Sequence, residues 1–307
     1  MTRTLRGVVV SLAVALSLAA CGGGGGDGDP LSGDTGGGGG VTVGSANFVE
    51  SSLLAEIYAQ ALEAKNIKVT RKFDIGAREV YYDQVVKGGL SVVPEYNGAL
   101  LATSVDKNSK ATTPDQINAE LKAKLPQSVE ILNSAQAEDK DSITVTKATS
   151  QKHNLTSLDQ LKNVAGQMTL AAGSEFKTRQ QGAVGLESVY GVKFKKFQSV
   201  DAGAQSTVVK LLKDGDIQAA NLYTTDPSIA AEGFVVLQDP KNLFASQNVT
   251  PLIYKSAVNA TGREALNAIS AKLTTQDLLD MMKRVSIDKA DQETVAKDWL
   301  KKAGLVS

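Results

Sequence analysis

Strand and helix signals alternate along the chain from Val41 onward, and this alternation constrains the fold more than any other feature. In the first half, short runs rich in β-branched residues alternate with segments whose apolar residues recur at helical spacing. The predicted elements are, in order, strand Val41–Val43, helix Leu53–Leu62, strand Val69–Phe73, helix Arg78–Lys87 and strand Leu90–Val93. Such alternation predicts a parallel sheet with helices packed on its faces.

Local signals mark the ends of these elements. Asn47 and Glu50 have the spacing of a capping box, which predicts a helix start at this point. Gly88-Gly89 is expected to end the second helix, and Pro94 is expected to close the third strand.

The same order of elements recurs in the second half of the chain. The predicted elements are helix Leu158–Val164, strand Met168–Ala172, helix Phe176–Tyr190, strand Val192–Phe197, helix Gln205–Lys213 and strand Ile217–Leu222. This recurrence predicts two α/β lobes, the first made of residues 41–141 and 250–307 and the second of residues 142–249.

Two segments are expected to cross between the lobes as strands, one in each direction, with a ligand cleft between the lobes. They are the β-rich Asp141–Thr146 and the Pro-containing Asn248–Tyr254. Helices near the C-terminus are expected to pack on the first lobe: Arg263–Leu273, Thr275–Val285 and Gln292–Ala303.

The single cysteine, Cys21, follows a short apolar run that stands behind Arg3 and Arg6. A membrane span takes about 20 apolar residues, so the run suits a secretory signal peptide better. Small residues before a lone cysteine predict a lipoprotein signal peptide over residues 1–20, with Cys21 as the lipidated first residue. The alternatives are an ordinary signal peptide with a chance cysteine at its end, or a buried cysteine near a frayed terminus. The glycine-rich residues 21–40 are predicted to be a flexible tether.

Composition argues against several classes of function. Lys and Arg together number 33, as do Asp and Glu, so the chain lacks the basic excess of a nucleic-acid-binding protein. With one cysteine and one histidine, His153, neither a zinc site of the usual kind nor an internal disulfide is expected. We therefore expect no metal and no cofactor. No run of about 20 apolar residues follows Cys21, so the mature chain is not expected to span a membrane.

Three loops are predicted to border the ligand cleft. In open α/β sheets, ligands bind beyond the carboxyl ends of the strands, where loops meet helix N-termini. The loops that meet this description are Gly44–Phe48, Gly173–Glu175 and Tyr223–Asp226.

Motifs in and near these loops resemble those of the ProX and OpuC type of osmoprotectant-binding proteins. These proteins are the soluble receptors of ABC importers for glycine betaine, choline and carnitine. The matching motifs follow the family's order and cover nearly all of the mature chain: Gly44–Glu50, Gly76–Val80, Pro94–Gly98, Gly173–Arg179, Gly185-Leu186, Tyr190-Gly191 and Tyr223–Asp226. The arrangement looks closest to the actinobacterial ProX-like lipoproteins. The resemblance implies an α/β fold of the type II periplasmic binding protein class.

The resemblance also implies which residues bind the ligand. Family members hold a trimethylammonium head in a cage of tyrosines and clamp the carboxylate with basic side chains. Arg179 matches the arginine of that clamp, and Tyr223 matches a cage tyrosine. From spacing alone, the alternatives are a surface arginine on a helix and a strand-end tyrosine. Asn47, Glu175 and Thr224 lie in the matching loops and are further candidates.

The chain departs from the family at several ligand positions. Ala46 stands where the family usually has lysine, and Ser91 and Val93 fall where it has Asp-x-Tyr, so one clamp charge and one cage tyrosine are missing. A further tyrosine is replaced by Gln247 or a neighbour, and Arg78 is a candidate to restore the lost cation. Further aromatic contacts are expected from Tyr81, Tyr82 or Tyr96.

These observations predict an extracytoplasmic solute-binding lipoprotein of an ABC importer. It would deliver an osmoprotectant of the glycine betaine or quaternary-amine class to a membrane permease and its ATPase by closure of the cleft. Because the cage is incomplete, the alternative is a receptor of the same fold for another small polar or polyhydroxylated ligand, in uptake or in sensing. A surface adhesin with this fold is a further alternative.

A remote alternative is an acyl-transfer enzyme. Ser174 and Lys177 fit the S-x-x-K pattern of penicillin-binding enzymes. Ser104–Lys107 fits the same pattern, and neither a Ser-Asp-Asn nor a Lys-Thr-Gly companion is present. We therefore expect no enzymatic activity.

Overall fold

The computed structural model describes residues 40–201 and 203–307. The predicted signal peptide, Cys21 and the tether up to residue 39 lie outside the described residues. None of the helices in residues 40–201 and 203–307 is both long and apolar enough to cross a membrane.

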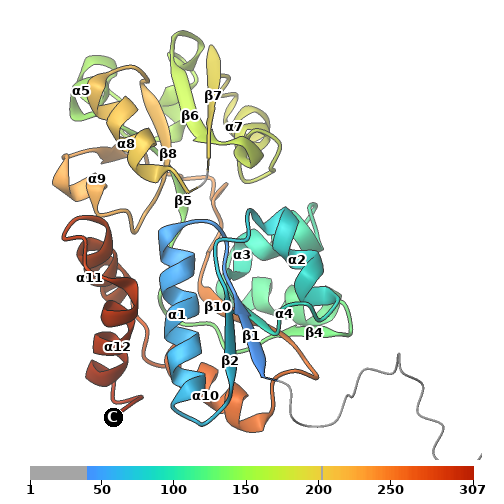
Figure 1. The fold of residues 1–307 in the computed structure, drawn as a ribbon. Coiled ribbons are helices and arrows are strands. Elements are labelled where there is room, and N and C mark those ends of the chain that lie inside the picture. The colour runs from blue at the N-terminus through green and yellow to red at the C-terminus, as the bar shows by residue number, and fades with distance from the viewer. Residues whose placement is uncertain (1–39, 202) are drawn as a thin grey trace, which may run out of the picture. The chain divides into compact units, whose positions relative to one another are not determined.

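One of the two sheets in the described residues has five strands in the order β2-β1-β3-β10-β4 (Figure 1). The strands are β1 (Val41–Gly44), β2 (Val69–Lys72), β3 (Val92–Tyr96), β4 (Val129–Ile131) and β10 (Val249–Tyr254). β1 pairs in parallel with β2 and β3, whereas β10 runs antiparallel to β3 and β4. The parallel part confirms the sheet predicted from the alternation in the first half of the chain.

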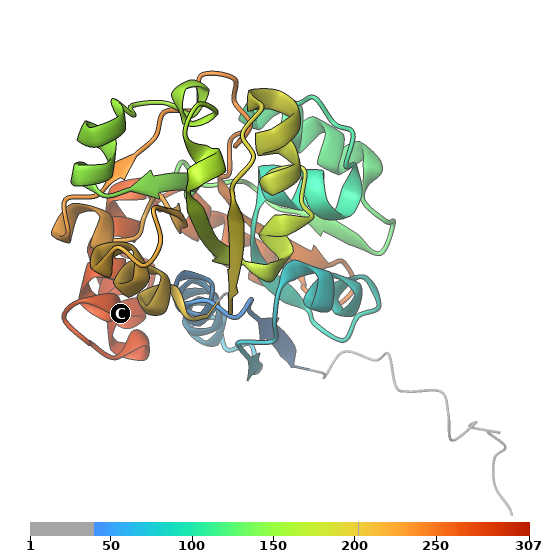
Figure 2. The ribbon, with the colours of Figure 1, turned by 90° about the horizontal axis from the view of Figure 1, so that it is seen from above.

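Helices cover this sheet on both sides and complete the first lobe. They are α1 (Val49–Glu63), α2 (Arg78–Val86), α3 (Asn97–Leu100), the π-helical turn η1 (Leu101–Val105), α4 (Pro114–Lys124), α10 (Ala260–Ser270), α11 (Thr275–Ser286) and α12 (Gln292–Lys302). Figures 1 and 2 show α11 and α12 on the opposite side of this lobe from α2, α3 and α4.

Helix α1 is the centre of the first core. Leu53, Leu54 and Ile57 are fully buried, and they share one apolar cluster with Leu266 of α10 and Trp299 of α12. Burial of each large apolar side chain contributes about 1.5–3 kcal/mol. This packing confirms that the C-terminal helices belong to the first lobe.

The other sheet has the strand order β7-β6-β8-β5-β9. Its strands are β5 (Asp141–Val145), β6 (Thr169–Gly173), β7 (Lys196–Val200), β8 (Ala219–Tyr223) and β9 (Val235–Val236). Its helices are α5 (Lys147–His153), α6 (Leu158–Leu161), the 3-10 turns η2 (Ala165–Gln167) and η3 (Ser174–Lys177), α7 (Ala183–Tyr190), α8 (Gln205–Asp214) and α9 (Ser228–Ala231). β6 pairs in parallel with β7 and β8, as the second alternation predicts.

The chain passes between the lobes through residues 132–140 and 237–248, which we call the crossing segments. An antiparallel bridge joins Glu138 to Asn248, so the two segments run side by side. β5 begins directly after the first crossing segment and β10 directly after the second. The prediction that these two strands themselves cross between the lobes is therefore wrong: β5 lies wholly in the second sheet and β10 wholly in the first, and the crossings are made by the segments that precede them.

The capping box predicted from Asn47 and Glu50 is not formed. Phe48 is the N-cap of α1, and no side chain caps the helix there. The Asn47 amide donates instead to Asp201 in the second lobe at 3.5 Å, and the Glu50 carboxylate accepts from Tyr96 and Thr225. Tertiary contacts have taken both side chains away from the helix end.

Pro94 does not close its strand, because β3 continues to Tyr96. Pro94 faces Pro251 of β10 in the antiparallel register. Antiparallel pairs alternate between hydrogen-bonded and non-bonded positions, and two prolines are compatible only with a non-bonded one. The Pro251 carbonyl accepts on its other side, from the Leu132 N–H at 2.9 Å.

The helix predicted over Phe176–Tyr190 is divided into η3 and α7. Between them the backbone folds so closely that a Cβ on Gly182 would lie 2.2 Å from the Phe176 carbonyl oxygen. Helix α7 ends, as predicted, at Gly191, which has a positive φ of 67°. Arg179 therefore lies on an irregular link and not on a helix.

Candidate ligand-binding site

A cavity of about 40 Å³ lies between the two lobes. Each of the three loops predicted to border the cleft contributes to its wall. The lining residues are Ala46, Asn47, Phe48, Ala77, Arg78, Tyr81, Tyr96, Ala99, Asp139, Asp141, Glu175, Arg179, Tyr223 and Gln247. A buried water needs about 10–15 Å³ on this measure, so the space holds about three or four waters. A larger solute requires the lobes to move apart.

Three aromatic rings form one row along the cavity wall. Phe48 stacks on Tyr223 with ring centroids 5.3 Å apart, and it lies 6.0 Å from the ring of Tyr96. Because Tyr223 comes from the second lobe and the other two from the first, the row bridges the cleft. Burial raises the pKa of Tyr223, so its hydroxyl stays protonated. Phe48 was not among the predicted contacts, although it stands in a predicted cleft loop.

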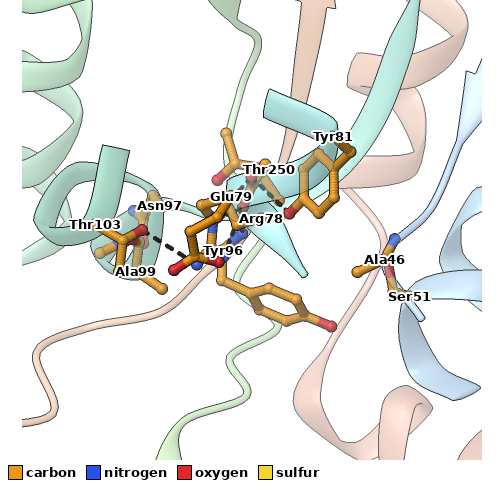
Figure 3. A network of polar contacts seen from close by, with 12 residues as sticks. Ala46, Ser51, Arg78, Glu79, Tyr81, Tyr96, Asn97, Ala99, Thr103 and Thr250 are labelled. Carbon is orange, nitrogen blue, oxygen red and sulfur yellow. Dashed lines mark hydrogen bonds and ion pairs between the residues drawn. The ribbon is translucent and has the colours of Figure 1, made fainter. Parts of the chain in front are cut away.

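Arg78 reaches the cavity but is held by a buried carboxylate of its own lobe. Its Nε donates to both oxygens of Glu95 at 3.0 Å, and a terminal nitrogen donates to one of them at 2.9 Å. Its other terminal nitrogen donates to Thr103 at 3.3 Å (Figure 3). The Tyr81 hydroxyl donates to Glu95 at 2.8 Å. Arg78 is 7% exposed and Glu95 is fully buried, so the charge predicted for a ligand is internally neutralised.

Arg179 is held across the cleft by Glu79 of α2. Its Nε donates to one carboxylate oxygen at 3.1 Å and a terminal nitrogen donates to the other at 2.9 Å. Burial alone would raise the pKa of Glu79, but the hydrogen bonds and charge of Arg179 outweigh it and lower the pKa. The predicted clamp arginine thus lies at the cavity and already binds a carboxylate.

Partly buried acidic groups form the remaining charged wall. Asp141 accepts a hydrogen bond from the Asn221 amide at 3.0 Å, and burial raises its pKa. Glu175 lines the cavity beside it, and the Ser174 hydroxyl lies 3.4 Å from its carboxylate. Within the described part of the chain, Ser174 has no hydrogen bond to Lys177. This arrangement gives no support to the acyl-transfer alternative.

Glu50 and Asp139 form a buried carboxyl pair where the lobes meet. Glu50 accepts from the Tyr96 hydroxyl at 2.7 Å and from the Thr225 hydroxyl at 2.6 Å. Asp139 accepts from the Thr225 N–H at 3.0 Å. Burial raises both pKa values, and the charge of Glu50 raises that of Asp139 further. The pair therefore favours retention of a proton while the lobes are in contact.

Two polar atoms of the cavity wall have no hydrogen-bond partner within the described residues. They are the Asn47 Oδ1, an acceptor, and the Gln247 Nε2, a donor. Gln247 is 3% exposed, and its side chain lies close enough to the Asp141 carboxyl to lower the pKa of that group against the effect of burial. Buried polar groups normally find a partner, so these atoms are suited to contact a polar ligand.

Ala46 lies at the cavity as predicted, whereas Ser91, Val93 and Thr224 do not line it. Ala46 lines the cavity with its methyl group and carries no charge into it. Ser91 and Val93 are buried in the first lobe and do not line the cavity: Ser91 accepts from the Thr42 N–H at 2.9 Å, and Val93 belongs to an apolar cluster separate from the one around α1. Thr224 accepts from the Lys140 N–H at 2.9 Å and contributes to the crossing rather than to the cavity.

Comparison with known proteins gives a consistent result. A family model named OpuAC, described as the substrate binding domain of ABC-type glycine betaine transport systems, matches residues 39–302. The glycine betaine-binding protein YehZ of Escherichia coli is 28% identical over 276 residues, which make up 86% of this chain and 90% of that protein.

Solved structures share the fold. The structure of apo YehZ from Escherichia coli has a TM-score of 0.62 at 26% identity and covers 88% of this chain and 100% of its own. The structure of a glycine betaine/carnitine/choline ABC transporter has a TM-score of 0.67 at 20% identity, covering 86% of this chain and 99% of its own. These similarities confirm the predicted type II periplasmic binding protein fold of two α/β lobes.

Proposed function

The chain belongs to the OpuAC family of substrate-binding domains of ABC-type glycine betaine transport systems, and we propose that it binds a small quaternary-ammonium solute between its lobes. This membership confirms the resemblance predicted from the motifs. As the substrate-binding protein of an ABC importer, the chain acts outside the cytoplasm together with a membrane permease. The family's role is solute binding and not catalysis.

The cross-cleft row of aromatic rings carries the proposal. Phe48, Tyr96 and Tyr223 line the cavity together with the partly buried Asp141 carboxyl. A cation over an aromatic face gains about 0.5–2 kcal/mol, and a nearby carboxylate adds attraction. The relative YehZ is named as a glycine betaine-binding protein, so solutes of this class are the first candidates.

Solute binding is proposed to close the lobes. The hinge would be formed by the crossing segments, with residues 41–141 and 250–307 in one lobe and residues 142–249 in the other. A solute that contacts both walls binds the closed form better than the open one, so it shifts the equilibrium towards closure. The permease would then recognise the closed form.

We also propose that lipidation of Cys21 anchors the protein to the cell membrane. A tether of about 20 residues has a root-mean-square reach of about 25 Å, which keeps the receptor close to its permease. Cys21→Ser is expected to move the protein from the membrane fraction to the soluble fraction and to abolish labelling by palmitate. Unchanged fractionation and labelling would refute the anchor while leaving the binding role intact.

Titration calorimetry tests the solute class. Glycine betaine, choline, carnitine and proline betaine are titrated into the protein without residues 1–39, which comprise the predicted signal peptide and nearly all of the predicted tether. At least one is expected to bind, and Tyr223→Ala is expected to weaken its binding. Absence of heat from all four solutes, with no compaction in X-ray scattering at saturating concentration, would contradict the proposal.

A further inference from the structure

The Glu79 carboxylate binds Arg179 in the geometry that a solute carboxylate would adopt. Two nitrogens of the guanidinium donate to two oxygens of the carboxylate, at 3.1 and 2.9 Å. This paired arrangement is the strongest that arginine forms with a carboxylate. Arg179 is 16% exposed on its side chain and Glu79 is 49% exposed. The arginine is thus enclosed in the cleft, whereas its partner stands at the edge of the cleft, on the first turn of α2.

The other guanidinium at the cavity is also neutralised. Arg78 pairs with the fully buried Glu95, which additionally accepts from the Tyr81 hydroxyl and the Tyr96 N–H. Because Glu95 is enclosed by its own partners, a solute cannot displace it without breaking these buried hydrogen bonds. Arg78 therefore offers no free positive charge to a solute.

The charges that remain at the cavity are negative. Once each arginine is matched with its glutamate, the acidic groups left in the wall are the carboxyls of Glu175, Asp141 and Asp139. Burial raises the pKa values of Asp141 and Asp139 and so reduces their share of the negative charge. A solute cation is attracted to such a wall, and a solute carboxylate is repelled by it. The wall attracts the cationic end of a zwitterion and repels its carboxylate end.

We propose that Glu79 is a specificity-determining residue, which satisfies Arg179 internally and so biases the cavity towards cationic solutes without a carboxylate over zwitterions. The inference rests on the proposed function, since it concerns the choice among quaternary-ammonium solutes. A solute carboxylate can still reach Arg179 if it displaces the half-exposed Glu79 into water, but the two hydrogen bonds between Glu79 and Arg179 are then lost.

The two polar wall atoms without partners fit the same class of solute. Asn47 Oδ1 is an acceptor and Gln247 Nε2 is a donor. A neutral hydroxyl on the solute offers both a donor and an acceptor, whereas a carboxylate offers acceptors alone. A hydroxylated ammonium compound therefore offers a partner to either atom without displacing Glu79.

The test is a ratio of affinities measured by titration calorimetry with choline and glycine betaine. Wild-type protein is compared with Glu79→Gln, which keeps the shape of the side chain but leaves Arg179 with uncompensated charge. The control is Asp201→Asn. It removes the same charge from another contact between the lobes, the 3.5 Å hydrogen bond from Asn47, and does not touch Arg179.

Wild-type protein is expected to bind choline more tightly than glycine betaine. Glu79→Gln is expected to shift the ratio towards glycine betaine by about tenfold or more, because a charge-assisted pair becomes available to the solute. Asp201→Asn is expected to leave the ratio unchanged. The ratio is informative because a general effect on lobe closure alters both affinities equally.

Each other result has a defined meaning. A ratio that Glu79→Gln does not change overturns the role of Glu79, whichever solute the wild type prefers. An equal shift of the ratio in Asp201→Asn also overturns it, since net charge alone would then explain the effect. No binding of either solute by any of the three proteins counts against the proposed function itself.

Discussion

Phe48 of the first lobe and Tyr223 of the second lobe stack with centroids 5.3 Å apart and planes inclined by 29°. Phe48 also lies 6.0 Å from Tyr96, so its ring is the middle member of the row that crosses the cleft. A side chain in this position has two roles. It supplies an aromatic face to the cavity, and it provides a contact between the lobes when they close.

Replacing Phe48 by leucine is expected to weaken binding of a quaternary-ammonium solute about two- to thirtyfold. Leucine keeps the apolar volume but removes the aromatic face, whose attraction for a cation is about 0.5–2 kcal/mol. Phe48→Tyr retains the ring and is expected to retain the affinity. Calorimetry with the tightest-binding solute measures both. Equal losses in the two variants would indicate that packing, and not the ring, is important.

The Arg78–Glu95 pair is expected to act in stability rather than in binding. Glu95→Gln leaves the buried guanidinium without its counter-charge, and breaking one partner of a buried pair typically costs about 3–5 kcal/mol. Urea unfolding followed by circular dichroism measures the loss. The matched control is Asp83→Asn, which removes the partner of Lys87 in an exposed pair, where about 0.5 kcal/mol or less is expected. Similar losses in both variants would contradict the assignment.

Much of the fold was predictable because its signals are local. The stripe that includes Leu53 and Ile57 has helical spacing, and the glycines at 191 and 215 end helices in the left-handed conformation, as their positions in the sequence indicate. Pro94 misled the prediction because its effect depends on register. Whether a proline breaks a ladder is decided by the strand opposite it, in this case at Pro251.

The site was less predictable because its charges are satisfied by residues far away in the sequence. Arg179 was correctly expected near the cleft, but its partner Glu79 lies 100 residues earlier and on the other lobe. Arg78 was expected to serve the ligand, yet Glu95 neutralises it. A sequence shows that a charge is present, but not whether another side chain has already paired with it.

The buried pair of Glu50 and Asp139 predicts a dependence of stability on pH. Burial raises both pKa values, so the folded chain binds protons more tightly than the unfolded chain. The contribution of the pair is fully present below about pH 4, where both states are protonated, and it is lost as the pH rises through the raised values. The neighbouring Asp226 and Asp141 add negative charge and act in the same direction.

Asp139→Asn tests this dependence because the amide keeps an acceptor for the Thr225 N–H. The free energy of unfolding is measured by urea titration at pH 5 and pH 8 for wild type and variant. Relative to wild type, the free energy of unfolding of the variant is expected to be higher at pH 8 than at pH 5 by about 1 kcal/mol or more. A tenfold change in proton affinity corresponds to about 1.4 kcal/mol. Parallel pH profiles would rule out a contribution from the pair.

Gly98, the last residue of the Pro94–Gly98 motif, sets how closely α3 approaches the second crossing segment. A Cβ at this position would lie 2.1 Å from the Ser246 carbonyl oxygen, so any side chain must push backbone away from backbone. Gly98→Ala is expected to lower the free energy of unfolding by about 1–3 kcal/mol, the usual range for overpacking. Gly166→Ala is the control, because nothing lies within 4 Å of its Cβ position. Urea unfolding measures the loss of unfolding free energy in both variants. An equal and small loss in the two would mean that the crossing segment moves aside without strain and would contradict the prediction.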